Sequence, residues 1–462
     1  MPSFVDMTRG SVFRHLVGFS WPIFAGGLLH ALYSAVDAFW VGNFLGGAGL
    51  ASVSVCFPLV FGASALVMGL SMAATALVSQ LFGAGMWGKL REVCRASVLL
   101  SAALGLFAAS VLAFLGGRLL SLLGVSPRIM GWAKSYLSLI ALGLPFAFVY
   151  QMGGALCRGL GDSRRPLLFL AFASALNVVL DPLLIGGVGG LVPPMGVVGA
   201  ALATSASQAL SAFLSLRHLW RSGLVNLLDL CSLPDRSISA LLFRIGLPAS
   251  LQQLLVSLGH AFLMSFVNAF GSTAAAAFGV GIRVDQFSSL PSMSLGFAVS
   301  SLVGQNLGAG RDDRVREVVR ISSLAGSSLA VSLALVVLLF APSIASLFVS
   351  DPSVVEESAS YLRHNAFNYL PFALMFVLAG VFRGAGDTLP TVLFTFLAMW
   401  GFRVPVAYLL AFGLRMGTRG IWIAMALSPY LSLLVQYAYY RSGLWRRRAA
   451  LRRLVGAEVF KL

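Results

Sequence analysis

The chain has 462 residues, of which 58% are hydrophobic and only 10% charged, whereas soluble domains carry about 25% charged residues. This composition excludes an ordinary soluble domain. In a soluble domain a formal net charge of +16 would suggest nucleic-acid binding, but here the basic residues lie between apolar runs. We therefore expect them to set membrane topology, and we expect no nucleic-acid partner.

Charge-free stretches of the chain have the length of membrane spans, about 20 residues each. Residues 38–88 and 245–282, for example, carry no charge at all. We interpret the basic N-terminus and the apolar run after it as the first span, not as a removed signal peptide. With charges, Pro and Gly as boundaries, the sequence predicts an all-α polytopic membrane protein with 12 transmembrane helices. We expect these helices at about 13–41, 49–82, 93–115, 132–157, 166–186, 196–219, 241–268, 274–306, 318–340, 358–382, 389–413 and 418–440.

Basic residues gather on one side of this predicted topology. Most of the 32 Lys and Arg residues precede the first span, follow an even-numbered span or lie in the C-terminal tail. An excess of Lys and Arg marks cytoplasmic loops, so both termini are expected in the cytoplasm of a prokaryotic inner or plasma membrane. The expected domains are an N-terminal six-helix lobe (1–219), a cytoplasmic linker (220–240), a C-terminal six-helix lobe (241–440) and a basic cytoplasmic tail (441–462).

The two halves of the chain repeat one pattern. Residues 77–97 match residues 302–322 at eleven of 21 positions without a gap, at an offset of 225. The same offset carries the RGLGD motif that begins at Arg158 onto the RGAGD motif that begins at Arg383. Because each half has six spans, both halves enter the membrane from the same side. Two duplicated six-helix lobes in parallel orientation are a transporter architecture.

Few charged residues fall within the predicted spans, and each needs a reason. The acids within the predicted spans are Asp37, Asp181 and Asp285, and the basic residues farthest from the span ends are Arg283 and Arg403. A carboxylate at the middle of a bilayer costs on the order of 2.5–3.5 kcal/mol on insertion scales. It therefore persists only where it is paired, neutral or in contact with water.

Two of these acids lie in the N-terminal lobe with polar residues at helical spacing. Tyr33 precedes Asp37 by four residues and Asn177 precedes Asp181 by four, so each pair shares a helix face. With the Thr204 hydroxyl, these groups can form a proton-sharing network or a site for a hard cation. Asp37, Asn177, Asp181 and Thr204 are the candidate Na⁺ ligands. The alternative is that the two acids only hydrogen-bond neighbouring helices.

The C-terminal lobe carries the remaining embedded charges. Asp285 lies two residues from Arg283, a spacing that does not share a helix face, but either residue could meet Arg403 or a loop. Asp285 is expected first in a structural pair within this lobe, with contact to a substrate as the alternative. His30 and His260 are expected as hydrogen-bonding core residues, with a place in a cavity wall as the alternative. The further candidates for a cavity or second polar site are Tyr136, His30, His260, Asp285, Arg283 and Arg403.

Several motifs together resemble the multidrug and toxic compound extrusion (MATE) family. They are the duplicated twelve-span plan, the Q-x-x-G-A-G ends of spans 2 and 8, the paired R-G-x-G-D motifs, and Asp37 within AVDAFWVG. The segment from Asn177 to Pro182 and the GAALAT segment ending at Thr204 resemble the DinF branch, whose ion site lies in the N-terminal lobe. Val256 and Phe372 stand where the NorM branch has acids, which argues against a NorM-type cation site in the C-terminal lobe.

This resemblance implies a secondary active multidrug exporter. It would antiport bulky organic compounds, often cationic and lipophilic, against H⁺ or Na⁺ by alternating access, as a monomer in the lipid bilayer and without a cofactor. The resemblance also implies that the first span bends at Pro22 when the N-lobe acid is protonated, with a static kink as the alternative.

Other functions remain as alternatives to the exporter. One is a flippase or exporter of lipid-linked precursors, and a remote one is an intramembrane prenyl-transferring enzyme, for which a second aspartate cluster is missing. No P-loop motif is present, so we expect a gradient to supply the energy and expect no enzyme.

Overall fold

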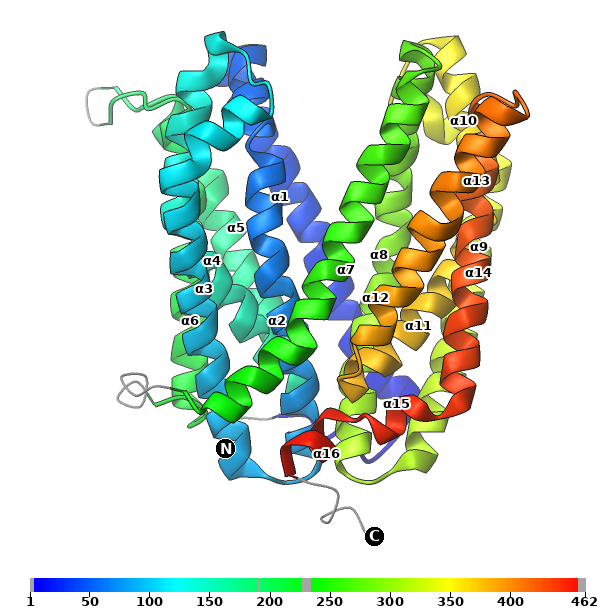
Figure 1. Ribbon diagram of the computed structural model, residues 1–462. Coiled ribbons are helices and arrows are strands. Elements are labelled where there is room, and N and C mark those ends of the chain that lie inside the picture. Colours follow the sequence, from blue (N-terminus) through cyan, green and yellow to red (C-terminus); the bar gives the residue numbers. More distant parts are fainter. Residues whose placement is uncertain (1–3, 190–191, 227–233, 456–462) are drawn as a thin grey trace. The chain divides into compact units, whose positions relative to one another are not determined.

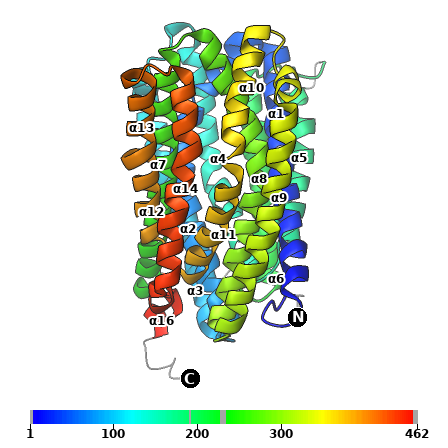
Figure 2. The same ribbon diagram turned by 90° about the vertical axis from the view of Figure 1, so that its right-hand side faces the viewer.

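All named secondary-structure elements in the described part of the chain are helices (Figures 1 and 2). The computed structural model describes residues 4–189, 192–226 and 234–455. Residues 227–233 of the expected linker and 456–462 of the expected tail lie outside the described residues.

The helices pack into two compact units. Unit 1 contains residues 4–5 and 25–250, and unit 2 contains residues 6–24 and 251–455. These boundaries differ from the expected lobes at two helices, because the start of the first helix packs in unit 2 and the start of the seventh packs in unit 1. Helical periodicity in the sequence shows that a helix has an apolar face but not which half of the chain will cover it.

Unit 1 is built around one buried helix. Its helices are α1 (Val12–Ser54) from residue 25 onward, α2 (Phe57–Gly83), α3 (Trp87–Leu122), α4 (Pro127–Gly159), α5 (Arg164–Ile185), α6 (Val197–Arg221) and α7 (Arg236–Asn268) up to residue 250. The central α4 packs against α2, α3 and α6. The chain in α1 turns sharply at Gly46, whose φ of 65° is unfavourable for other residues. The first helix therefore continues past its predicted end at residue 41 as far as the break at Gly46, and a second helical segment follows this break up to Ser54.

Unit 2 has a comparable arrangement around α8. Besides residues 6–24 of α1 and the end of α7, it contains α8 (Ser272–Gly308), α9 (Asp312–Ser346), α10 (Pro352–Ala366), α11 (Tyr369–Ala385), α12 (Leu389–Phe396), the π-helical η2 (Leu397–Arg403), α13 (Val404–Tyr408), the π-helical η3 (Leu409–Gly413), α14 (Thr418–Ser442), α15 (Leu444–Arg447) and α16 (Ala450–Val455). Helix α8 packs against α9, α10 and α11.

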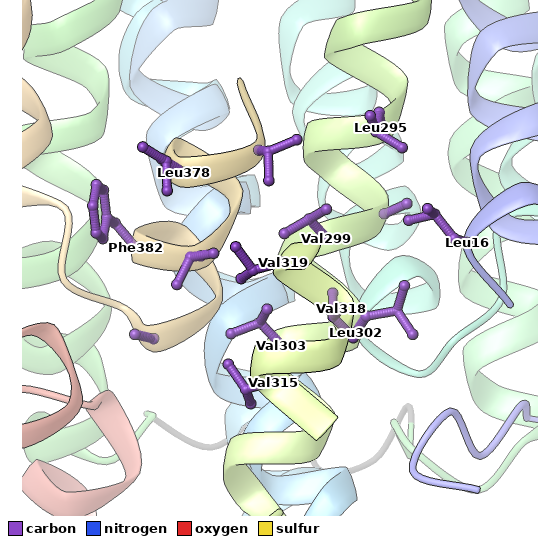
Figure 3. Close-up of a cluster of buried hydrophobic side chains, with 14 of the residues drawn as sticks. Leu16, Leu295, Val299, Leu302, Val303, Val315, Val318, Val319, Leu378 and Phe382 are labelled. Carbon is purple, nitrogen blue, oxygen red and sulfur yellow. The ribbon is translucent and has the colours of Figure 1, made fainter. Parts of the chain in front are cut away.

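A buried apolar cluster holds four elements of unit 2 together (Figure 3). Figure 3 labels Leu16 of α1, Leu295, Val299, Leu302 and Val303 of α8, Val315, Val318 and Val319 of α9, and Leu378 and Phe382 of α11. Met7 and Trp445 belong to the same cluster. The beginning of the first helix and the segment after α14 therefore lie at the same end of unit 2, which agrees with an even number of spans.

The helices are long and apolar enough to cross a membrane. Among the described residues, eleven pass this test by length and composition, and α10 with α11 adds a twelfth when this bent pair is counted as one span. The prediction of an all-α membrane protein with 12 transmembrane helices in two six-helix lobes is thereby confirmed.

The tenth span is broken, although the sequence predicted one helix over 358–382. Helices α10 and α11 meet at an angle of 50°. Pro371 has no N–H to donate to the carbonyl of Phe367, four residues earlier. Instead, the Tyr430 hydroxyl donates to that carbonyl at 2.7 Å. The break is thus stabilised by a side chain from α14.

Candidate functional site

The N-terminal polar residues meet inside unit 1. Asn177 and Asp181 on α5 are completely buried, and the Asn177 Nδ2 group donates to Asp181 Oδ1 at 3.2 Å. The Tyr33 hydroxyl on α1 donates to Thr204 Oγ1 on α6 at 3.4 Å. The carboxyl groups of Asp37 and Asp181 lie close enough to interact directly with one another. Helices α1, α5 and α6 thus bring together the five residues that the sequence suggested, hereafter the acidic cluster.

Two of the further candidates lie beside this acidic cluster. Tyr136 on α4 interacts electrostatically with Asp37 and Asp181 and packs against the small apolar cluster that contains Val41. The His30 ring stacks on Tyr33 with the ring centroids 6.1 Å apart. His30 is exposed, so the expectation of a core position was wrong for this residue. Tyr136 therefore adds a fourth helix of unit 1 to the surroundings of the two acids.

Three hydrogen-bond acceptors of the acidic cluster lack a donor within the part of the chain that the structure describes. Asp37 Oδ1, Asn177 Oδ1 and Asp181 Oδ2 are buried and have no hydrogen-bond partner among the described residues. No ion pair in the described part of the chain includes Asp37 or Asp181. A buried acceptor without a partner costs roughly 1–3 kcal/mol. A proton, a cation or a water molecule at this place would remove that cost, so the residues present fit a hard cation with oxygen ligands.

The acid in unit 2 has neutral partners, not the basic partner that the sequence suggested. The hydroxyl of Tyr361 donates to Asp285 Oδ2 at 2.6 Å, and the hydroxyl of Tyr369 donates to Asp285 Oδ1 at 3.1 Å. The Asn365 amide also donates to Asp285 Oδ2. Among the described residues, no ion pair within 4 Å includes Asp285, Arg283 or Arg403. The expected Asp285–arginine pair is therefore not formed.

Asn365 and Tyr369 are site residues that the sequence analysis missed. Both lie on the predicted tenth span with Tyr361, at intervals of four residues, so they share a helix face. This spacing of polar residues was the available signal, but neutral polar residues cost less than charges in a membrane helix and therefore indicate a site less strongly.

Asp285, Arg403 and His260 line one cavity of about 310 Å³ in unit 2. The Arg403 Nε group donates to the Ser428 hydroxyl at 2.5 Å. His260 thus occupies a cavity wall, which was the alternative to a core position.

Pro22 lies at a point where α1 can change direction. Pro22 lies inside α1, two residues before the helix passes from unit 2 into unit 1. Pro248 holds the corresponding place in α7, two residues before that helix passes from unit 1 into unit 2. A proline inside a helix removes one backbone hydrogen bond and permits a kink.

Comparison with known proteins supports the same architecture. The MatE family model matches the chain twice, over residues 22–183 and 248–409. The two matches coincide with the internal repeat. The probable multidrug resistance proteins YpnP and YoeA of Bacillus subtilis are 33% and 30% identical to this chain; YpnP aligns over 96% of this chain and 97% of its own length, and YoeA over 96% of each.

A solved structure agrees with the fold as a whole. The crystal structure described as MATE in the bent conformation has a TM-score of 0.89 and 25% sequence identity, and the alignment covers 98% of this chain and 99% of that chain. The duplicated six-helix units, the two family matches and the full-length relatives lead to one conclusion. The chain belongs to the MatE family, a family of multi-pass membrane transporters.

Proposed function

We propose that the protein is a secondary active exporter of bulky organic compounds, driven by inward movement of H⁺ or Na⁺. The relatives named as multidrug resistance proteins support the substrate class. The acidic cluster of unit 1 supports coupling to a cation. The distribution of basic residues supports a cytoplasmic membrane with both termini inside.

The observation that carries the proposal is that the completely buried Asp181 and the partly buried Asp37 interact directly through their carboxyl groups. Two unit charges about 4 Å apart repel one another by about 4 kcal/mol at an effective dielectric constant of 20. A proton shared between the carboxyl groups, or one bound cation, removes this repulsion. The free energy of this pair of carboxyl groups therefore changes when a proton or a cation binds or leaves. Such a pair can couple ion binding to a conformational change.

The neighbouring groups define what the coupling ion would meet. Asp37 Oδ1, Asp181 Oδ2 and Asn177 Oδ1 are the acceptors that lack a partner among the described residues, and the Thr204 hydroxyl is a further oxygen. Na⁺ would be bound by these four residues, whereas a proton would be held between the two carboxyl groups. Each monovalent cation that moves inward across 100 mV releases about 2.3 kcal/mol.

Pro22 provides the conformational part of the proposal. Residues 6–24 belong to unit 2 and the rest of α1 to unit 1, and Asp37 lies on the same helix as Pro22. A change of charge at Asp37 is therefore transmitted along α1 to a residue where the helix can bend. Alternating access follows when the bend changes with the charge of the acidic cluster.

Dye transport into inverted membrane vesicles tests this function. Ethidium accumulation should require either an imposed pH gradient or an imposed Na⁺ gradient, and the two gradients are applied separately to identify the ion. Asp37→Asn and Asp181→Asn should each abolish accumulation, because an amide keeps the shape of the side chain but cannot change its charge. Asp313→Asn, which neutralises an exposed acid, is the matched control and should transport normally.

Two results would contradict the proposal. One is ethidium accumulation by wild-type vesicles that neither gradient affects. The other is normal gradient-dependent accumulation by either cluster variant at wild-type expression.

A further inference from the structure

The cavity of unit 2 lies where two helices depart from regular geometry. Asn365, Asn368 and Tyr369 line it from the break between α10 and α11. Arg403 lines it from the end of the π-helical segment η2. In transporters, discontinuous helices commonly surround binding sites, and π-helical turns are frequent at functional sites. The broken helix and the π-helical turn at this one cavity therefore indicate a ligand-binding site.

Pro405 explains why the helix widens at Arg403. Without an N–H, Pro405 cannot donate to the carbonyl four residues earlier, and the Val404 N–H donates to the Met399 carbonyl, five residues back. This i to i−5 bond is the π-helical pattern. The wider turn places the Arg403 guanidinium in the cavity wall.

One side of the cavity offers hydrogen-bond acceptors. From the described residues, the Asp285 carboxyl accepts two hydrogen bonds at Oδ2 and one at Oδ1, whereas a carboxylate has about four acceptor sites. Asn365 Oδ1 and Asn368 Oδ1 are buried and have no partner among the described residues. These oxygens together match a ligand group that donates several hydrogen bonds, such as an ammonium group.

The other side of the cavity offers a cation. Arg403 uses Nε for the Ser428 hydroxyl and forms no ion pair within 4 Å among the described residues. Its remaining donors match a carboxylate, which a guanidinium binds in a bidentate way. Because Asp285 and Arg403 line the cavity without pairing, each keeps binding capacity for a ligand.

The combination of charges selects the ligand class. Asp285 would repel a simple anion and Arg403 would repel a simple cation, so a ligand carrying both charges fits better than either. Apolar side chains also line the cavity, among them Leu333, Phe372 and Met425. A volume of about 310 Å³ lies at the lower end of the range for small-molecule sites.

We propose that unit 2 contains a binding site for small zwitterionic organic molecules. The ammonium group of the ligand lies beside Asp285, its acidic group beside Arg403, and its apolar part against Phe372 and the neighbouring side chains. This site is separate from the acidic cluster of unit 1, and ligand binding there does not depend on an ion gradient.

Equilibrium dialysis of the purified full-length protein in detergent at neutral pH tests the proposal. The probes are phenylalanine, its amide as a cation, and its N-acetyl derivative as an anion, so the apolar part is constant. Phenylalanine should bind at least tenfold more tightly than either derivative. Asp285→Asn should lower the affinity for phenylalanine at least tenfold without lowering the affinity for the anionic N-acetyl derivative. Arg403→Gln should also lower the affinity for phenylalanine at least tenfold, without lowering the affinity for the cationic amide. General misfolding would lower the affinity for all three probes.

Two further variants keep the test decisive. Ser289→Trp adds bulk to the cavity wall and leaves the Asp285 partners in place, so it should reduce phenylalanine binding even if the charge variants fold poorly. Asp313→Asn is the matched control outside the cavity and should bind as the wild type does. Equal affinity for the three probes, absence of saturable phenylalanine binding by the wild type, or unchanged phenylalanine binding by Asp285→Asn and Arg403→Gln would overturn the proposal. Because no gradient is applied, these results are independent of ion coupling at Asp37.

Discussion

Substitutions of Asp181 separate the charge of this residue from its hydrogen bonding. Asp181 is completely buried and accepts a hydrogen bond from the Asn177 amide at 3.2 Å. Asp181→Asn removes the charge but retains an oxygen that can accept this bond. Asp181→Leu removes both. The two variants therefore share the loss of charge and differ in whether Asn177 keeps an acceptor.

The structure sets the size of the expected difference. Loss of one charge removes a repulsion with Asp37 of up to about 4 kcal/mol, for two charges about 4 Å apart at an effective dielectric constant of 20. Asp181→Asn should therefore be at least as stable as the wild type. Asp181→Leu leaves the buried Asn177 amide without its acceptor, which costs about 1–3 kcal/mol. It should accordingly be less stable than Asp181→Asn by about that amount.

The assay combines thermal unfolding of the purified protein in detergent with ethidium accumulation in inverted vesicles. We expect both variants to lose gradient-driven accumulation and only Asp181→Leu to unfold at a lower temperature than Asp181→Asn. If Asp181→Asn is clearly less stable than the wild type, then Asp181 holds helices together as a charged partner. That outcome would refute the assignment of its charge to coupling.

Three further predictions concern packing, capping and topology. Gly380→Leu should destabilise unit 2 by about 1–3 kcal/mol or more, because a Cβ atom there would lie 2.5 Å from a backbone carbonyl oxygen of α8. Thermal unfolding measures this effect, and an unchanged unfolding temperature would contradict the close packing of α8 and α11. Hydrogen bonds from Ser353 hold the pKa of Asp351 below its ordinary value, so Asp351→Ala should lower the unfolding temperature at neutral pH. The difference in unfolding temperature between wild type and variant should vanish as the pH falls through the lowered pKa. A difference that persists in acid would exclude stabilisation by the charged form of Asp351. In a cysteine-free background, a membrane-impermeant thiol reagent added outside cells should label Gly47→Cys and not Gly88→Cys, and the reverse pattern would invert the topology.

The fold class was predictable because the membrane imposes a strong constraint on composition. Spans must be long and nearly free of charge, and the repeat shared by residues 77–97 and 302–322 indicates two equivalent halves. The exact course of single helices was not predictable in the same way. Pro22 and Pro248 remain inside continuous helices, whereas Pro371 lies beside a break. At the break, the Tyr430 hydroxyl donates to the carbonyl that Pro371 leaves free, a contact between residues far apart in the sequence that the local pattern does not reveal.

The sequence predicted best those site residues whose placement in a membrane costs the most free energy. Asp37 and Asp181 stand out because an embedded carboxylate is expensive, and their four-residue spacing to Tyr33 and Asn177 indicated two polar helix faces. Nothing in the sequence specified that the partners of Asp285 would be neutral. Neutral tyrosine and asparagine side chains cost less to bury than a charged carboxylate, so the sequence does not single them out, and their pairing with an acid is seen only once the helices are packed.

The two units retain one tyrosine at equivalent positions but carry their acids on different helices. Tyr136 on α4 interacts with Asp37 and Asp181, which lie on α1 and α5. At an offset of 225 residues, Tyr361 on α10 donates to Asp285 on α8. In unit 1 the two acids interact with one another, and neither forms an ion pair with a basic residue in the described part of the chain. In unit 2 a single acid has three neutral donors and shares its cavity with a guanidinium. The duplication therefore preserved the helical scaffold while the chemistry of the two sites diverged, and only unit 1 should respond directly to an ion gradient.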